Sequence, residues 1–315
     1  MSCSGLSIFV FSYNRGVFLK NCLNSVFECN EGKFPVFVID DNSNDPEVNS
    51  ALKDAVSEFG VEVVKNNRND REFKTGGLCG SMNTAMKIAQ EQRCKYALFI
   101  QDDMQFLRGV ETKDVENFGS YFAANPQSLQ LTLCFFPRLG HLERGGEVVL
   151  DPSKVAWRRL PKYEGGKSHF SDVGLFHVER FFQYLGRFEP GEEVNSARCA
   201  DAGLYRGLYR APIMHWLPFP KSFRGGKRSL LHSFLEDLCG AGFHPYLPCG
   251  VTKRELVMRE WSDPQIVAES ALISPTAPES KFWSVTGGVS QVYARGGWRL
   301  FLFRIFQLFR RGFWR

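Results

Sequence analysis

Three segments carry the pattern from which the architecture of this chain follows: LSIFVFSYNR (6–15), VFVIDDNSND (36–45) and YALFIQDD (96–103). Each begins with a short apolar run of strand type and ends in a polar cluster. The stretches 17–29, 46–59 and 80–91 have apolar residues at helical spacing, and 61–64 is a further short strand. This alternation predicts an α/β fold with a mostly parallel mixed sheet flanked by helices.

The three polar clusters, SYNR, DDNSND and QDDMQ, each follow the carboxyl end of a predicted strand. Ligands of open α/β sheets bind outside these ends. The adjacent carboxylates of Asp102 and Asp103 repel each other unless a cation lies beside them. A divalent metal with a nucleotide diphosphate meets this need, because Mg²⁺ and Mn²⁺ prefer carboxylate and phosphate oxygens. We therefore expect a ligand site at this edge of the sheet.

Other ligand motifs are excluded. Asp41, Ser43 and Asp45 have the spacing of a calcium-binding loop, but its sixth position is Pro46 rather than Gly and its twelfth is Leu52 rather than Glu. No G-x-G-x-x-G motif follows the first strand, and the chain has no G-x-x-x-x-G-K-[ST] loop. The sequence thus favours neither a calcium site of this type, nor a dinucleotide fold, nor a P-loop.

In their order, spacing and position at strand ends, the three segments resemble the nucleotide-binding half of the family 2 glycosyltransferases with the GT-A fold. The likeness is greatest to the spore-coat polysaccharide branch of that family, whose R-x-x-K-T loop matches residues 71–75, and it covers residues 5–107. The resemblance implies inverting transfer of a sugar from a nucleoside-diphosphate sugar, UDP or dTDP, to a hydroxyl of a glycan or lipid-linked acceptor. It also implies Mn²⁺ or Mg²⁺ as the assisting metal.

The resemblance assigns roles to individual residues. The expected nucleotide-binding residues are Ser12, Asn14, Asp41, Arg71 and Asp102. Asp41 would accept a hydrogen bond from a uracil or thymine N–H, and Arg71 would lie near the base or diphosphate, or else be a solvated loop residue. Asp103 would ligate the metal, while Asp102 would face the ribose or the metal.

Three further polar residues of this half have structural interpretations. Asp40 is expected to cap the turn that follows its strand. Asn14 and Asn83 could hold loop backbone, or could simply be polar residues of a turn and a helix.

Inversion by direct displacement needs a base that takes the proton of the acceptor hydroxyl. Asp201, in CADAGLYRG, is the first choice, and Glu193, in LGRFEPGEEVN, is the second, although the Glu-Asp pair of the family is Glu-Glu here. Asp172 is a third possibility. His215 could be a metal or phosphate ligand or a packed core residue. The basic loop 221–228 could close on the leaving diphosphate or be solvated.

The charge of the chain is concentrated at its end. The net charge is +5, from 39 Lys and Arg against 34 Asp and Glu, and the segment WRLFLFRIFQLFRRGFWR (298–315) contains five Arg and no acid. The remainder is neutral, which argues against nucleic-acid binding. On a helical wheel the Trp298–Arg315 tail has a broad apolar face opposite its Arg residues, as in helices that lie on a membrane surface. Docking on the protein's own core, or in a dimer interface, is the alternative.

The expected location is the cytoplasm, with peripheral attachment to the cytoplasmic face of the membrane. No signal peptide or transmembrane stretch is recognisable, and the nine Cys residues form no C-x-x-C pair, which is typical of free thiols in a reducing compartment. We expect four segments: a nucleotide-sugar half (1–107), an acceptor and catalytic half (108–245), a C-terminal extension (246–295) and the basic amphipathic tail (296–315).

Two other functions stay open at this stage. One is a sugar nucleotidyltransferase, which would carry a Gly-rich basic loop after its first strand, and SYNRG matches that poorly. The other is a non-catalytic, membrane-docked, transferase-like binding protein, which the altered Glu-Glu pair keeps open.

Overall fold

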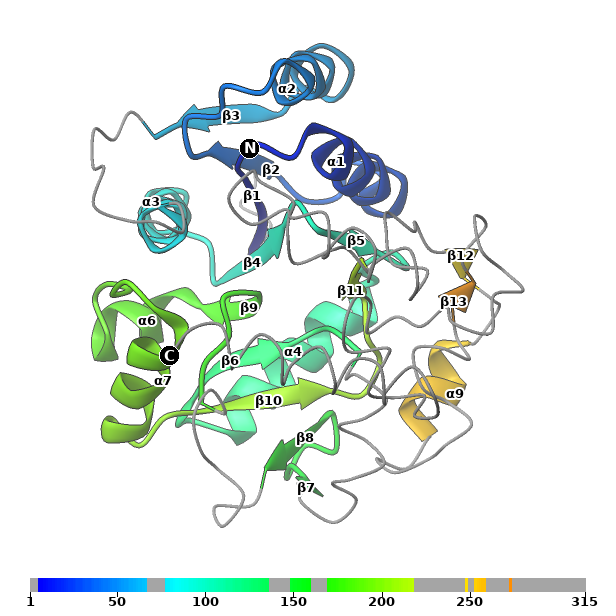
Figure 1. Cartoon of the computed structure of the whole chain (residues 1–315). Helices are drawn as coiled ribbons and strands as arrows, with labels where there is room; N and C mark the ends of the chain where they lie inside the picture. Colours follow the sequence, from blue (N-terminus) through cyan, green and yellow to red (C-terminus); the bar gives the residue numbers. More distant parts are fainter. Residues whose placement is uncertain are drawn as a thin grey trace, which may run out of the picture.

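The computed structural model describes residues 5–66, 77–135, 148–159, 169–217, 247–248, 252–258 and 272–273. In these ranges one large sheet has helices on both faces (Figure 1). Its strands are β1 (Leu6–Ser12), β2 (Val36–Asp40), β3 (Glu62–Lys65), β4 (Tyr96–Gln101), β6 (Ser128–Thr132), β7 (Val148–Leu150), β8 (Ala156–Arg159), β9 (Gly174–His177) and β10 (Tyr205–Tyr209).

The helices of the main body are α1 (Gly16–Asn30), α2 (Pro46–Phe59), α3 (Leu78–Glu91), α4 (Thr112–Ala124), α6 (Val178–Tyr184) and α7 (Glu192–Asp201). A small antiparallel pair is formed by β5 (Met104–Phe106) and β11 (Met214–Trp216). The described part of the extension contains α9 (Lys253–Met258) and the antiparallel pair β12 (Leu247–Pro248) and β13 (Leu272–Ile273).

The strand order places the carboxyl ends of several strands at one edge. The order in the described sheet is β3-β2-β1-β4-β9-β6-β10-β8-β7. The strands β1, β2, β3 and β4 run parallel, and β9 is antiparallel to both β4 and β6. Since β10 is parallel to β6, β4, β6 and β10 all point the same way. The expected α/β fold with a mixed, mostly parallel sheet is confirmed.

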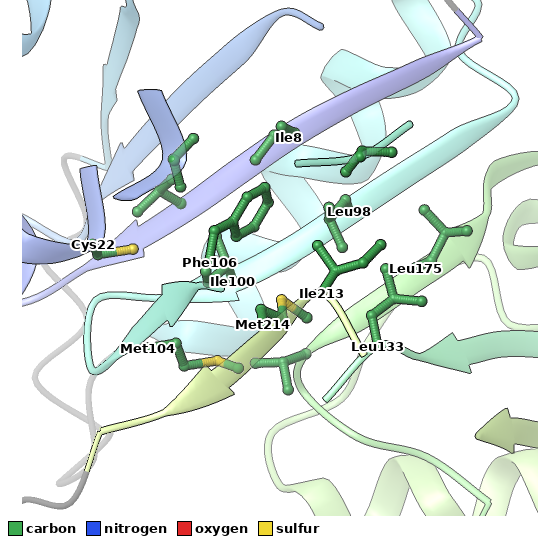
Figure 2. Close-up of a cluster of buried hydrophobic side chains, with 14 of the residues drawn as sticks. Ile8, Cys22, Leu98, Ile100, Met104, Phe106, Leu133, Leu175, Ile213 and Met214 are labelled. Atoms are coloured by element: carbon green, nitrogen blue, oxygen red, sulfur yellow. The ribbon is translucent and has the colours of Figure 1, made fainter. Parts of the chain in front are cut away.

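Two apolar layers enclose the sheet. Alternate residues of β1 lie on opposite faces: Ile8 and Val10 pack with α1, α2 and α4, and Phe9 and Phe11 pack with α3, α6 and α7. Burial on both faces explains why the strands are continuous apolar runs rather than alternating ones. Figure 2 shows the first layer, in which side chains of β1, β4 and β9 lie close to those of β5 and of the segment leading into β11.

Asp114 ties the described part of the extension to α4. Its buried carboxylate forms ion pairs with Arg108 (2.7 Å) and with Lys253 of α9 (2.8 Å), and accepts a hydrogen bond from the Tyr209 hydroxyl (2.7 Å). Burial alone would raise the pKa of Asp114, but these donors lower it to about 2. The side chain therefore stays ionised and holds three separate segments together. The division of the chain into four segments stays a prediction.

Helices α1 and α2 approach closely where they begin. Asp45 caps α2 by accepting a hydrogen bond from the Glu47 N–H (2.9 Å), and it also accepts one from the Gly16 N–H (3.2 Å). A Cβ atom on Gly16 would lie 2.2 Å from the Cβ of Glu47 and 2.6 Å from its carbonyl carbon. Only glycine fits at this crossing without moving α2.

Replacing Gly16 by alanine should therefore destabilise the protein. The new methyl group meets backbone, which cannot swing aside, so we expect a loss of about 1–3 kcal/mol in the free energy of unfolding. Urea denaturation followed by circular dichroism measures this. Gly119→Ala is the matched control, because its Cβ would meet only the Tyr96 hydroxyl at 3.9 Å and alanine favours the α4 helix. Equal stability of the two variants would contradict the proposed crowding.

Candidate nucleotide and metal site

Three strand ends bring the polar clusters of the sequence together. Ser12 ends β1, Asp40 ends β2 and is followed by Asp41, and Asp102 and Asp103 follow β4. The pairing continues past the strands, since the Asp41 N–H donates to the Ser12 carbonyl and the Asp102 N–H to the Phe11 carbonyl, both at 3.0 Å. The predicted edge site is thus assembled by the parallel pairing of β2, β1 and β4.

Arg15 lies against the acidic pair. One guanidinium nitrogen forms an ion pair with Asp102 Oδ1, and the other donates to Asp103 Oδ2 at 3.0 Å. Asp102 and Asp103 are both buried, and the Arg15 side chain is 17% exposed. The Tyr13 N–H donates to the second oxygen of Asp102 at 3.2 Å. Arg15 was not among the predicted site residues. The signal for it in the sequence is that it is the basic residue of the first polar cluster and that two adjacent acids require a cation.

Burial affects both the ionisation of Asp102 and the hydrogen bonding of its neighbours. Burial raises the pKa of Asp102 to about 7; Arg15 acts against this rise and Asp103 adds to it. In the described part of the chain, Ser12 Oγ and Asp103 Oδ1 are buried without a hydrogen-bond partner. Buried polar atoms without partners are rare in folded proteins. Both atoms lie at the edge of the sheet where the sequence predicts a ligand.

The donor set at this edge fits Mg²⁺ or Mn²⁺. Both ions bind carboxylate oxygens and are commonly held by one or two carboxylates together with phosphate oxygens of a substrate. Within the described ranges, no group of three His, Cys, Asp or Glu side chains is placed to hold a metal ion. A metal here would therefore use Asp103, with Asp102, and take its other ligands from a diphosphate and water.

The DDNSND turn is held by its own hydrogen bonds. Asp40 accepts from the N–H and the hydroxyl of Ser43, at 2.9 and 2.6 Å, as a turn-capping carboxylate should. The Asn14 side-chain oxygen accepts from the N–H groups of Asn44 (2.9 Å) and Asp45 (3.2 Å). Asn14 thus joins the loops after β1 and β2. These contacts are the loop-holding function considered for Asn14; its contact with a nucleotide stays a prediction.

Asp41 faces the start of α3. The Gly77 N–H, at the N-cap of that helix, donates to Asp41 Oδ2. A Cβ atom on Gly77 would lie 2.6 Å from Asp41 Oδ1, so a larger residue here would displace the Asp41 carboxylate. The positive end of the helix dipole stabilises the carboxylate. Asp41 is therefore oriented, half-buried, beside Ser12 at the same edge.

The second half of the chain returns to this edge beside α3. Asn83 holds the backbone of Phe188, donating to its carbonyl at 3.0 Å and accepting from its N–H at 2.7 Å. Burial raises the pKa of the Cys79 thiol in the first turn of α3. A hydrogen bond from the Gly191 backbone acts against this rise, and the nearby charge of Asp172 adds to it. Since Gly191 is the N-cap of α7, the exposed Glu193 lies in the first turn of a helix that starts near the nucleotide edge.

Asp201 lies at the other end of α7. It is exposed and stands just before β10, whose first residue, Tyr205, pairs with Ser128 at the start of β6. Since β6 and β10 run in the same direction as β4, their first residues lie at the edge opposite Asp102 and Asp103. The structure does not bring Asp201 to the acidic pair.

His215 lies inside the β5–β11 pair. It is buried, pairs with Gln105, and has the rings of Phe135 and Trp216 about it, at 6.0 and 5.9 Å between ring centroids. Burial lowers the pKa of His215 to about 3, so the imidazole is neutral. This is the packed environment considered for it.

Three predicted features lie outside the described residues: Arg71, the basic loop 221–228 and the Trp298–Arg315 tail. Within the ranges that the structure describes, no helix combines the length and apolarity that a membrane crossing requires. The six described Cys residues are free, and four of them are buried.

Comparison with known proteins identifies the domain that carries this site. Residues 7–121 match the family model described as Glycosyl transferase family 2. No curated protein matches the chain. The matched range contains the ends of β1, β2 and β4 together with Arg15, Asp41, Asp102 and Asp103. The match supports the expected family 2 glycosyltransferase domain over these residues. The observed sheet flanked by helices agrees with the expected α/β fold, and the spore-coat likeness stays a prediction.

Several solved structures are similar to this chain. S. aureus TarS is 12% identical over 82% of this chain and 43% of that chain, with a TM-score of 0.48. The structure of S. aureus TarS 1-349 in complex with UDP is 15% identical over 69% of this chain and 62% of that chain, with a TM-score of 0.46. The mannosyltransferase PcManGT from Pyrobaculum calidifontis, in complex with GDP-Man and Mn2+, is 14% identical over 66% and 57%, with a TM-score of 0.42. The chain spans less than half the length of TarS.

The raised pKa of Asp102 predicts a pH-dependent stability. An unfolded Asp has a pKa of about 3.9, whereas that of folded Asp102 is about 7. The folded protein thus holds this proton more tightly than the unfolded chain, and its stability falls as the pH rises from about 4 to about 7. Asp102→Asn cannot ionise, so we expect it to melt above the wild-type protein at about pH 8, with the difference vanishing near pH 4.

Differential scanning calorimetry at the two pH values measures this effect. Glu58→Gln, a change of an exposed carboxylate on α2, should leave the melting temperature close to that of the wild-type protein at both. A lower melting temperature for Asp102→Asn at the higher pH would show that the ion pair with Arg15 outweighs the cost of burying the charge.

Proposed function

We propose that the protein is an inverting, metal-assisted glycosyltransferase that moves a sugar from a nucleoside-diphosphate sugar to a hydroxyl of a glycan or lipid-linked acceptor. The observation that carries this proposal is the buried Asp102–Asp103 pair at the carboxyl end of β4, inside a segment that matches the family 2 model. In this proposal the buried acids hold the metal and the ribose, and the neighbouring strand ends hold the base.

The donor would lie along the ends of β2, β1 and β4. Asp41, oriented by α3, accepts a hydrogen bond from the N–H of a uracil or thymine base, which favours UDP or dTDP. Ser12, with its unpartnered buried hydroxyl, lines the nucleotide. Asp103 holds the metal and Asp102 faces the ribose or the metal. The metal, when bound, offsets the charge that develops on the leaving diphosphate.

Glu193 is the base that the geometry favours. It is exposed in the first turn of α7, and the start of that helix lies beside the first turn of α3. A carboxylate here can accept the proton of an acceptor hydroxyl that approaches from solvent. Asp172, which lies shortly before β9 and close to the first turn of α3, is the alternative candidate for the base. Asp201, at the opposite edge, is disfavoured, and the attachment of Trp298–Arg315 to a membrane surface stays a prediction.

Donor hydrolysis tests the proposal directly. Purified protein with Mn²⁺ and a panel of UDP-, dTDP- and GDP-sugars should release the nucleoside diphosphate from at least one donor. Asp103→Asn should reduce release by about 10²-fold or more, because the metal contact is lost. Glu58→Gln, an exposed carboxylate change on α2, should have no effect. No release from any donor would favour a non-catalytic binding protein, and full activity of Asp103→Asn would contradict the metal assignment.

Two further variants separate the base candidates. Glu193→Gln should lower kcat with an acceptor by about 10²–10⁴-fold, since it removes the group that takes the proton. It should leave the affinity for the nucleoside diphosphate unchanged. Asp201→Asn should behave like the wild-type protein in both measurements. The reverse pattern would assign the base to Asp201.

A further inference from the structure

Arg15 occupies a position that local rules disfavour. It is the N-cap residue of α1, where its side chain makes no capping hydrogen bond, and the first turn of α1 contains no acidic residue. Ser, Thr, Asp and Asn are the usual N-cap residues. A cation is also unfavourable at the positive end of the helix dipole. Such a departure from local preference is expected where a residue serves a site.

The compensation for this position comes from Asp102 and Asp103. The Arg15 guanidinium contacts one oxygen of each carboxylate, and its contact with Asp103 Oδ2 is 3.0 Å long. When both acids are ionised, the three groups together carry a net charge of −1. The Arg15 guanidinium therefore already offsets the charge that a bound metal would otherwise neutralise.

Two cations compete for the same carboxylate in this arrangement. Among the described residues, Asp103 Oδ1 has no hydrogen-bond partner, while Asp103 Oδ2 accepts a hydrogen bond from Arg15. A divalent ion placed on Asp103 would lie close to the guanidinium, and like charges at such distances repel strongly where water is excluded. A diphosphate removes the conflict, because phosphate oxygens offer Arg15 a new bidentate partner.

We propose that Arg15 is a positioning residue that holds Asp102 and Asp103 in place while the donor is absent and releases Asp103 when a diphosphate binds. This inference rests on the proposed function. Its consequence is that the protein binds metal weakly by itself and tightly only together with nucleotide, with Arg15 as a source of the coupling. By linkage, the metal strengthens nucleotide binding by the same factor.

Binding of Mn²⁺ alone tests this role without any measurement of catalysis. The full chain is titrated with Mn²⁺ and free Mn²⁺ is followed by electron paramagnetic resonance, with and without UDP. Wild-type protein should bind Mn²⁺ at least about tenfold more tightly when UDP is present. Arg15→Gln should bind Mn²⁺ about tenfold more tightly than wild type in the absence of UDP, because the competing charge is gone. The gain on adding UDP should shrink in this variant.

Two further variants make the result interpretable. Arg187→Gln removes an exposed Arg that pairs with Glu189 at 2.7 Å, and should leave both affinities unchanged. Arg15→Lys keeps the positive charge, but its single ammonium group cannot bind both carboxylates through separate nitrogens as the guanidinium does. It should raise the affinity for Mn²⁺ alone by a smaller factor, and it serves as the test if Arg15→Gln fails to fold by circular dichroism.

A folded Arg15→Gln or Arg15→Lys protein that binds Mn²⁺ alone no more tightly than wild type would overturn the proposal and leave Arg15 as a structural counterion. A wild-type affinity for Mn²⁺ that UDP does not change would overturn it as well. Failure of every protein, wild type included, to bind Mn²⁺ with or without UDP would instead contradict the proposed function.

Discussion

Two carboxylates share one guanidinium at the end of β4, and the arrangement of this domain depends on that contact. Asp102 and Asp103 are buried side by side, and Arg15 offsets their charge from the neighbouring strand end. The parallel pairing of β1 with β4 is what places Arg15 beside them. Without this cation, two ionised acids in a site closed to water would repel each other strongly.

The loops next to the acidic pair are held by hydrogen bonds between side chains and backbone. Asp40 and Asn14 hold the turn after β2, and Asp45 joins the starts of α1 and α2. Their side chains bond to backbone N–H groups, so they fix the path of the chain. A site built in this way presents Ser12, Asp41 and Asp103 from rigid strand ends, as pre-organised binding requires.

The second half of the chain contributes through a different route. Asn83 on α3 holds the backbone at Phe188, and the start of α7 lies against the first turn of α3. Helix α7 then carries the chain to the opposite edge, so its two ends serve different surfaces. Glu193 and Asp201 are eight positions apart in the sequence. Because they lie at opposite ends of α7, only Glu193 is near the edge that carries the acidic pair, and it is the favoured candidate for the base.

The amino-acid sequence alone predicted the alternation of strands and helices, the edge at which the polar clusters gather, and the capping role of Asp40. These features follow from local periodicity and from the direction of parallel strands. The partner of the acidic pair and the position of the base candidates were not predictable in this way. Arg15 reaches Asp102 across 87 positions, and Asp201 is separated from the site by the direction of β10. Both depend on which strands pair and in which direction, and only the tertiary structure decides this, because strand pairing joins segments that no local pattern connects.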